Sequence, residues 1–272
     1  MITSLETALD KQIYWAAARY SKINNFQLHY GKKLAAKVGI KQGDKILDMG
    51  CGTGELTSFI GEIVGKQDRV VGVDPDIDGI HYANQHNCNV NENVSFEIGD
   101  SSSKFVQPNK SFYDAHFSNF SFQWLTLDEK KEFSQTAFEC LKPNGQIALK
   151  SHEGYPEIAL FAEYLISKKQ NALTYINDKK LIQFFISKDE TTSLIEEMGF
   201  VIISSDYDIG KQRYETLDDF LNFFSAFDYH ATSMSYSERK EFMARFGNED
   251  GSVNLVDDTL YQIVTRKNCR SG

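Results

Sequence analysis

Short apolar runs rich in β-branched residues alternate with longer amphipathic stretches through the middle of the chain. The apolar runs predict strands at residues 45–49, 69–74, 94–98, 113–118 and 146–150. Between them, apolar residues recur at helical spacing over residues 54–64, 78–87 and 128–140. Strands that alternate with helices in this order form a parallel sheet with helices on both faces. We therefore expect an α/β fold built on a doubly wound, Rossmann-like sheet.

The pattern changes on either side of this region. Residues 1–40 predict two helices, and residues 152–248 read as mostly helical. Further strands at 201–205 and 260–265 would complete a seven-stranded sheet. The motif Lys142-Pro143-Asn144-Gly145 predicts a turn that ends a helix and begins a strand. We interpret residues 1–272 as one domain, with N-terminal helices (1–40), a sheet core (41–151), a helical cap that includes the sixth strand (152–248), and the last strand and tail (249–272).

Residues 216–229 predict a helix with a broad aromatic face. Thr216 is placed to cap its start, and Asp218 and Asp219 fall in its first turn. The aromatic residues at helical spacing are Phe220, Phe223, Phe224 and Phe227. Because this segment interrupts the chain between two strands, we expect it to cap the carboxyl ends of the sheet. The rings either pack between the cap and the sheet or line an apolar substrate pocket, together with Tyr229, Phe242 and Phe246.

Composition narrows the classes of function. Lys and Arg number 29 against 38 for Asp and Glu, so the formal charge is −9, which disfavours nucleic acids and anionic membranes as partners. The four cysteines are far apart and have no metal-binding spacing, so we expect neither a disulfide framework nor a metal site. No long apolar run marks a membrane span or a leader, and we expect a cytoplasmic protein. The sequence carries no indication of oligomeric state.

A glycine-rich turn follows the first predicted strand, in the segment Asp48-Met49-Gly50-Cys51-Gly52-Thr53-Gly54-Glu55. Glycine at alternate positions lets the backbone approach a ligand closely, and the helix start favours electronegative groups. A dinucleotide-binding GxGxxG fingerprint would need glycine where Glu55 stands. A phosphate-binding loop fails as well, because the spacing from Gly61 to Lys66 is one residue short. The loop instead reads DxGxGxG, and the Asp48 carboxylate suits a ligand that carries an ammonium group.

This loop resembles that of the class I S-adenosylmethionine-dependent methyltransferases, and the motifs between about residues 40 and 151 follow the family's order. The resemblance implies that S-adenosyl-L-methionine is the cofactor. Asp74, at the end of the second strand, matches the acid that accepts both ribose hydroxyls. The other residues that the resemblance assigns to the cofactor are Asp48, Gly50, Cys51, Gly52 and Gly54 in the loop, Pro75 after Asp74, Asp100 and Ser101 near the adenine, Asn119 beside the methionine part, and Tyr20 over the sulfur.

A second resemblance concerns the methyl acceptor. The segment from Asn119 to Phe122 lacks the two prolines found at this place in amine methyltransferases of nucleic acids. The segment from Tyr20 to Gln27 resembles the YxxxNxxQ motif of insect juvenile hormone acid O-methyltransferases. Gln123-Trp124 is similar to their His-Trp pair, with glutamine in place of histidine. This resemblance implies that Gln27 and Trp124 donate hydrogen bonds to a substrate carboxylate.

We therefore expect a methyltransferase that O-methylates the carboxylate of a small acid with an apolar or aromatic body. A carboxylate is ionised at neutral pH, so it needs orientation but no general base. Related enzymes that act on aconitate or on malonyl thioesters share the scaffold. One alternative is an N- or C-methyltransferase of a small metabolite, with His152 after the fifth strand as general base. Another is a catalytically silent module that binds the cofactor or a partner.

Overall fold

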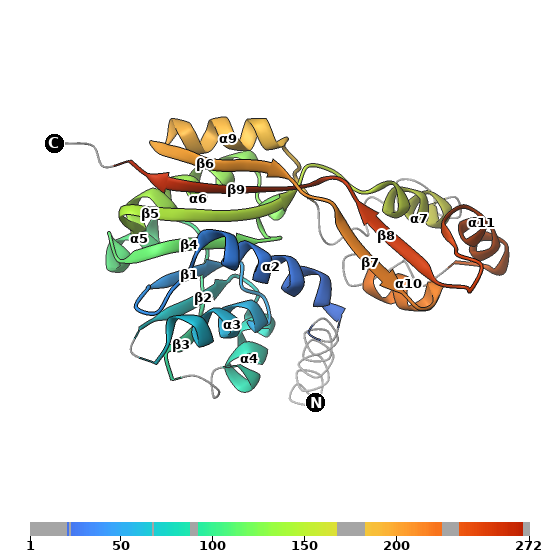
Figure 1. The fold of residues 1–272 in the computed structure, drawn as a ribbon, viewed down its shortest axis with the longest axis horizontal. Helices are drawn as coiled ribbons and strands as arrows, with labels where there is room; N and C mark the ends of the chain where they lie inside the picture. Colours follow the sequence, from blue (N-terminus) through green and yellow to red (C-terminus); the bar gives the residue numbers. More distant parts are fainter. Residues whose placement is uncertain are drawn as a thin grey trace, which may run out of the picture.

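A seven-stranded sheet forms the centre of the molecule. The computed structural model describes residues 21, 23–66, 68–87, 92–167, 183–224 and 234–268. The sheet has the order β3-β2-β1-β4-β5-β9-β6, and β9 runs antiparallel between β5 and β6 (Figure 1). Its strands are β1 (Ile46–Met49), β2 (Val70–Asp74), β3 (Val94–Ile98), β4 (Tyr113–Asn119), β5 (Leu141–His152), β6 (Phe200–Tyr207) and β9 (Leu260–Lys267). The predicted α/β class and the doubly wound, seven-stranded sheet are confirmed.

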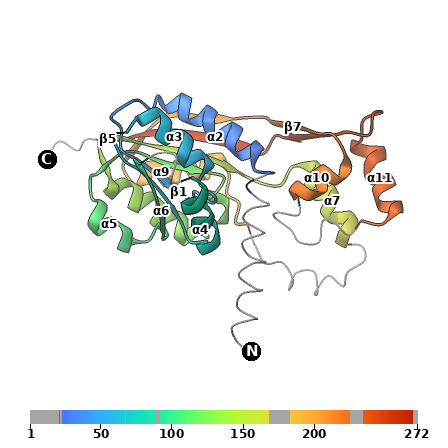
Figure 2. The ribbon, with the colours of Figure 1, turned by 90° about the horizontal axis from the view of Figure 1, so that it is seen from below.

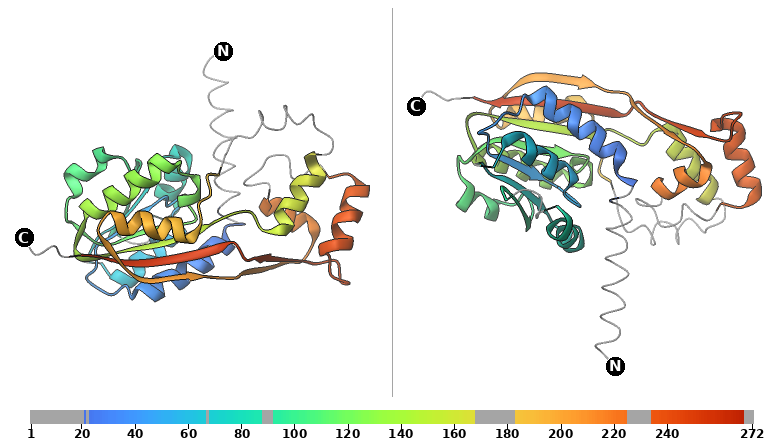
Figure 3. Two further views of the ribbon diagram at one scale, coloured as in Figure 1. Left: turned by 90° about the horizontal axis from the view of Figure 1, so that it is seen from above. Right: turned by 60° about the horizontal axis from the view of Figure 1, so that its bottom comes forward.

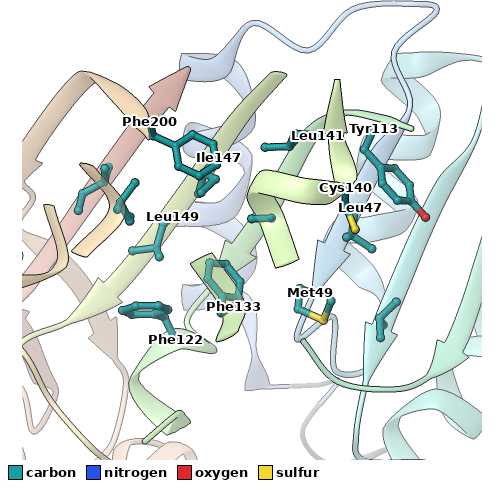
Figure 4. Close-up of a cluster of buried hydrophobic side chains, with 14 of the residues drawn as sticks. Leu47, Met49, Tyr113, Phe122, Phe133, Cys140, Leu141, Ile147, Leu149 and Phe200 are labelled. Carbon is teal, nitrogen blue, oxygen red and sulfur yellow. The ribbon is translucent and has the colours of Figure 1, made fainter. Parts of the chain in front are cut away.

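Helices cover both faces of the sheet. On one face lie α2 (Asn25–Val38), α3 (Glu55–Val64) and α4 (Ile77–His86), which share a cluster of buried side chains with Ile46 of β1. On the other face lie α5 (Ser103–Asn109), α6 (Leu127–Cys140) and α9 (Lys188–Glu197), whose cluster includes Leu47. Figure 4 shows Phe133 of this second cluster beside Phe122 and Leu149. Successive strand residues thus face opposite clusters, as in a sheet that is buried on both sides.

A lobe extends beyond the carboxyl ends of β5 and β6 (Figures 2 and 3). It consists of α7 (Glu157–Ser167), β7 (Gly210–Tyr214), α10 (Leu217–Phe224), α11 (Tyr236–Phe246) and β8 (Val253–Asp257). All of these elements precede β9, as predicted for the cap, and all but α7 lie between β6 and β9. The two-stranded sheet of β7 and β8 was not predicted from the sequence, because both strands are only five residues long and β7 is mostly polar. Among the helices that the structure describes, none is long and apolar enough to cross a membrane.

Aromatic side chains form the interior of the lobe. The rings of Phe220 in α10 and Phe242 in α11 are almost fully buried, with centroids 5.4 Å apart. Phe223 contacts α2, which covers the sheet: its ring centroid lies 6.3 Å from that of Phe26. The predicted helix start is present, since the Thr216 hydroxyl accepts the amide of Asp219 at 3.1 Å. The aromatic helix therefore packs the lobe internally and joins it to α2. Of the rings singled out in the sequence, Phe227 and Tyr229 lie outside the described residues.

The predicted turn at residues 142–145 is instead a bulge within β5. Helix α6 ends at Cys140, and β5 begins at once with Leu141. Leu141 pairs with Tyr113, and the register then resumes five residues later at Gln146. The chain bends at Asn144, whose φ angle of 64° is in the left-handed region. The strand is held here by an ion pair between Lys142 Nζ and Asp114 of β4, 2.6 Å long, which a local reading of turn residues does not reveal.

Candidate active site

Three glycines shape the turn after β1. Gly50, Gly52 and Gly54 have φ angles of 82°, 53° and 87°, in the left-handed region that favours glycine. The amide of Gly50 donates to the carbonyl of Val73 in β2 at 2.7 Å. A Cβ atom on Gly50 would lie only 2.2 Å from Cβ of Ser121, which follows β4. The loop therefore presents bare backbone between the carboxyl ends of β1, β2 and β4.

Asp48 lies inside the protein near the end of β1, with 1% of its surface exposed. The Thr57 hydroxyl of α3 donates to its Oδ2 at 2.6 Å. Burial raises the pKa of Asp48 to about 6, although the hydrogen bond from Thr57 acts in the opposite direction. Burial also raises the pKa of the Cys51 thiol, and the nearby carboxylates of Asp48 and Asp74 add to this effect. A cationic group bound here would favour the ionised form of Asp48.

Asp74 ends β2, beside the glycine loop. Its Oδ2 accepts the amide of Gly52 at 2.9 Å, and its Oδ1 accepts the amide of Asp76 at 2.8 Å. Burial raises the pKa of Asp74, and these two hydrogen bonds oppose that increase. Pro75, between the two acids, is exposed. A carboxylate oxygen can accept more than one hydrogen bond, so Asp74 can also receive hydroxyl groups of a ligand.

The end of β3 lies next to that of β2. The amide of Gly99 donates to the carbonyl of Asp74 at 3.1 Å, and Asp100 follows. Asp100 is exposed, and hydrogen bonds from the side chain and amide of Ser102 hold its pKa below the usual range. Ser101 is buried, and its carbonyl accepts a hydroxyl from α6 at 2.7 Å. Of the two predicted residues, Asp100 is thus open to a ligand, whereas Ser101 joins the loop to α6.

The start of α2 is tied to the glycine loop by residues to which the sequence reasoning gave no role. Asn24, 7% exposed, donates its side-chain amide to Oε2 of Glu55 at 2.9 Å. The same oxygen accepts the Thr53 hydroxyl at 2.6 Å. Oε1 of Glu55 is buried and has no partner among the described residues. The available signal was the asparagine of the YxxxNxxQ motif, which is Asn24.

Gln27 and Asn119 meet where α2 crosses the carboxyl end of β4. The Asn119 side-chain amide donates to the carbonyl of Gln27 at 3.0 Å. Oε1 of Gln27 and Oδ1 of Asn119 are both buried and have no partner among the residues that the structure describes. There is no room for a side chain at Gly31, one turn further along α2, because its Cβ would lie 2.9 Å from Nδ2 of Asn119. Since buried polar atoms are normally paired, these two amide oxygens are candidates for contact with a ligand.

Phe120 connects this place to the end of β5. It has a left-handed φ angle of 58°, which is rare for a bulky side chain and clusters at functional sites. Its ring centroid lies 5.7 Å from that of Phe26 in α2 and 5.1 Å from that of His152. The Phe120 ring therefore connects His152 to Phe26, the residue that precedes Gln27 in α2.

His152 ends β5 and is held by the lobe. Its Nδ1 lies 3.1 Å from Oδ2 of Asp257, the last residue of β8, and 3.3 Å from the hydroxyl of Thr259. Asp257 is 2% exposed. Burial raises the pKa of Asp257, but the hydrogen bonds with His152 and Thr259 together bring it below its ordinary value. A carboxylate at Nδ1 orients the ring so that Nε2 can accept or donate a proton. The sequence offered no signal for Asp257.

The remaining predicted residues are Gln123, Trp124 and Tyr20. Gln123 is 3% exposed, donates to the carbonyl of Phe120 at 2.9 Å and accepts the hydroxyl of Ser151 at 3.0 Å. Both ends of the Gln123 side-chain amide are therefore engaged in hydrogen bonds within the protein. Trp124 is half-buried in the short helix η1 (Phe122–Trp124), which follows β4 directly. Tyr20 lies outside the described residues.

Comparison with known sequences links the chain to methyltransferases. A family described as Methyltransferase domain matches residues 46–145. The uncharacterized methyltransferase C70.08c of Schizosaccharomyces pombe is 26% identical, and the match covers 95% of this chain and 92% of the yeast protein. The similarity therefore includes the sheet, the lobe and the N-terminal region.

Solved structures share the fold. A methyltransferase in complex with the Haloferax volcanii Trm112 methyltransferase activator superposes with a TM-score of 0.63 at 16% identity, covering 95% of this chain and 96% of that one. Geranyl diphosphate methyltransferase in complex with SAM has a TM-score of 0.55 at 12% identity, covering 93% and 90%. The span that matches the domain family contains Asp48, Asp74 and Asn119.

Proposed function

We propose that this S-adenosylmethionine-dependent methyltransferase, whose fold is that of the class I enzymes, methylates a carboxylate oxygen of a small, largely apolar acid. The enzyme class and the cofactor, S-adenosyl-L-methionine, are confirmed as predicted from the sequence. The carboxylate and the apolar body of the acceptor belong to the proposal, as does the resemblance to the juvenile hormone acid branch.

The loop fits the cofactor in shape and in charge. Gly50 leaves bare backbone where a Cβ atom would collide with Ser121, and Asp48 is a buried acid whose pKa a cation would lower. We assign the amino acid part of the cofactor to Asp48 and the loop, the ribose to Asp74, and the adenine amino group to Asp100. When bound, S-adenosyl-L-methionine supplies an electrophilic methyl group on a positively charged sulfur. The protein then has to orient the acceptor and keep water away.

The observation that carries the acceptor proposal is Oε1 of Gln27, which is buried and has no hydrogen-bond partner among the described residues. Gln27 is 9% exposed, and its backbone carbonyl accepts the side-chain amide of Asn119. A half-turn of the terminal torsion exchanges the two ends of a glutamine amide, so Gln27 can offer either its oxygen or its NH₂ group to a ligand. Toward a carboxylate it would donate a hydrogen bond. Phe26 and Phe120 lie close by and provide an apolar environment for the rest of the acid.

Neutral donors suit this reaction. A full ion pair with arginine or lysine would stabilise the carboxylate before reaction and weaken its attack on the methyl group. The buried cation in this region, Lys150, is already paired with Asp208 at 2.5 Å. We propose Trp124, in the turn after β4, as the second residue that orients the acceptor. Gln27 and Trp124 would then fix the head group, and the aromatic side chains would hold the apolar body.

A second candidate function is favoured by the pair of His152 and Asp257. A histidine oriented by a buried carboxylate is the usual arrangement of a general base. In this case the acceptor would carry a proton, as an amine or an acidic carbon does, and His152 would remove it during methyl transfer. The acceptor would still lie beside Phe120, because that ring contacts His152.

One experiment separates these possibilities. The protein is incubated with S-adenosyl-L-methionine and a library of small acids and amines, and methylated products are identified by mass spectrometry. Methyl esters of apolar acids would support the main proposal, whereas methylated amines or carbons would support the second candidate. Absence of turnover, with the cofactor bound in calorimetry, would instead favour a catalytically silent module.

A further inference from the structure

Tyr30 joins α2 to the segment that leads into the lobe. Its side chain is 3% exposed, one turn beyond Gln27 on the same helix. The hydroxyl accepts the amide of Lys211 at 2.8 Å and donates to the carbonyl of Ile209 at 3.1 Å. Both partners lie where β6 passes into β7. A single hydroxyl group thus satisfies two backbone groups of this connection.

A buried ion pair holds the same connection from the other side. Lys150 of β5 is fully buried, and its Nζ lies 2.5 Å from Oδ2 of Asp208. The same Nζ stands 4.6 Å from the centre of the Tyr30 ring. Separating this pair would leave a buried charge without a partner, which costs several kcal/mol. The position of residues 208–211 is therefore coupled to the core sheet.

Phe26, one turn earlier on α2, packs against the same connection. We call the contacts of Phe26 and Tyr30 with residues 208–211 the joint. Gly210 has no space for a side chain, because a Cβ atom there would lie 2.6 Å from the Phe26 ring and 2.7 Å from Leu260. Phe26 also contacts Phe223 of the lobe and Phe120 of the candidate site. The same two turns of α2 thus pack against the lobe and carry Gln27.

From these contacts we propose that Tyr30 is a positioning residue, which acts through α2 to hold Gln27 at the acceptor site. The hydroxyl fixes α2 to the entrance of the lobe, so the helix cannot slide over the end of β4 while its two hydrogen bonds remain. Displacement of about 1 Å at a reacting group can cost a hundredfold in rate, so this restraint has kinetic consequences. The proposal rests on the proposed function for the role of Gln27.

The first test is hydrogen exchange on the full chain. Tyr30→Phe keeps the ring and removes both hydrogen bonds, and Gly210→Ala disturbs the same joint without altering Tyr30. Tyr113→Phe is the matched control, because Tyr113 is equally buried and its hydroxyl bonds Asn109, at the other end of β4. We expect amides of α2 to exchange about tenfold faster in the first two variants and at the normal rate in the control. Unchanged exchange in Tyr30→Phe would overturn the proposal.

The second test is a double-mutant cycle with Gln27→Ala, using an acceptor from the library. If Tyr30 acts through Gln27, Tyr30→Phe lowers kcat/KM by about tenfold in the wild-type background and much less when Gln27 is already absent. Equal losses in both backgrounds would indicate a general structural role and contradict the proposal. If Gln27→Ala alone leaves kcat/KM unchanged, the proposed function of Gln27 fails, while the exchange result still reports whether Tyr30 holds α2.

Discussion

Nδ1 of His152 lies 3.1 Å from Oδ2 of Asp257, so a residue of the core sheet is oriented by a residue of the lobe. The carboxylate is buried and also accepts the amide and hydroxyl of Thr259, at 3.0 and 2.7 Å. These contacts leave the ring little freedom. The state of the lobe and the orientation of His152 are therefore linked, whichever acceptor is methylated.

The pH profile of the reaction tests the role of His152. For a carboxylate acceptor we expect kcat/KM to stay flat from about pH 6.5 to 8.5, because the acid is ionised throughout. The variant His152→Asn should then lose less than about tenfold in kcat, whereas loss of a general base costs roughly 10² to 10⁴. A rate that falls as histidine becomes protonated, and that disappears in His152→Asn, would favour the second candidate function.

Asp74→Ala should weaken cofactor binding. The substitution removes the proposed acceptor of the ribose hydroxyls and the partner of the Gly52 amide, so we expect the dissociation constant in calorimetry to rise at least about tenfold, or about 1.4 kcal/mol. Asp76→Ala is the control. Asp76 caps α4 by accepting the amide of Asp78, and its loss should cost about 1 kcal/mol of stability with normal affinity. Unaltered affinity in Asp74→Ala would refute the assignment.

Gly50→Ala should abolish cofactor binding, because the added methyl group has no space in the glycine loop. The new Cβ would meet Ser121 at 2.2 Å, in addition to the strain of a left-handed φ angle of 82°. Gly251→Ala separates the two effects, since its φ angle is 85° but no atom lies within 4 Å of the added Cβ. We expect thermal unfolding to show a loss of about 1 kcal/mol for Gly251→Ala, with full cofactor affinity. Equal behaviour of the two variants would argue against a close approach at Gly50.

Asp48 should make the ligand-free protein less stable as the pH rises. Its pKa is about 6 in the fold against 3.8 in the unfolded chain, so folding favours the protonated form. The contribution is fully present below about pH 4 and is lost as the pH rises through 6, to a total of about 3 kcal/mol. Denaturant unfolding of Asp48→Asn should lack this slope, whereas Asp189→Asn, on the surface of α9, should retain it. A slope that is identical in wild type and Asp48→Asn would contradict the assignment.

The same residue predicts how cofactor affinity depends on pH. A bound ammonium group favours ionised Asp48, so binding should release a proton near pH 6. We expect affinity to decline as the pH falls below about 6 in wild type and to change much less in Asp48→Asn. Calorimetry in buffers of different ionisation enthalpy measures the released proton directly.

Local sequence patterns predicted most of the sheet. The strand at residues 94–98 was placed at its observed bounds, and the helix at 128–140 began one residue late. Asp48 and Asp74 could be found because each stands next to a strand end, within a motif that spacing defines. Their separation along the chain is bridged by the parallel pairing of β1 and β2, which follows from the fold class.

Contacts between distant segments were not predictable in this way. Asp257 ends a strand of only five residues, and nothing near it in the sequence points to His152. The contact of Asn24 with Glu55 depends on where α2 crosses the loop. The bulge at residues 142–145 is accompanied by an ion pair between Lys142 and Asp114 of the neighbouring strand. In each case the decisive partner is set by tertiary packing, which a single sequence does not reveal.

The antiparallel pairing of β6 with β9 has a consequence for how such enzymes diversify. Tyr207, at the end of β6, pairs with Tyr261, at the start of β9, so the chain leaves for most of the lobe and returns at adjacent points. A short turn between these two strands would keep all seven strands of the sheet. Natural variation or laboratory exchange of the intervening segment can therefore change β7, α10, α11 and β8 while the sheet and the glycine loop are kept.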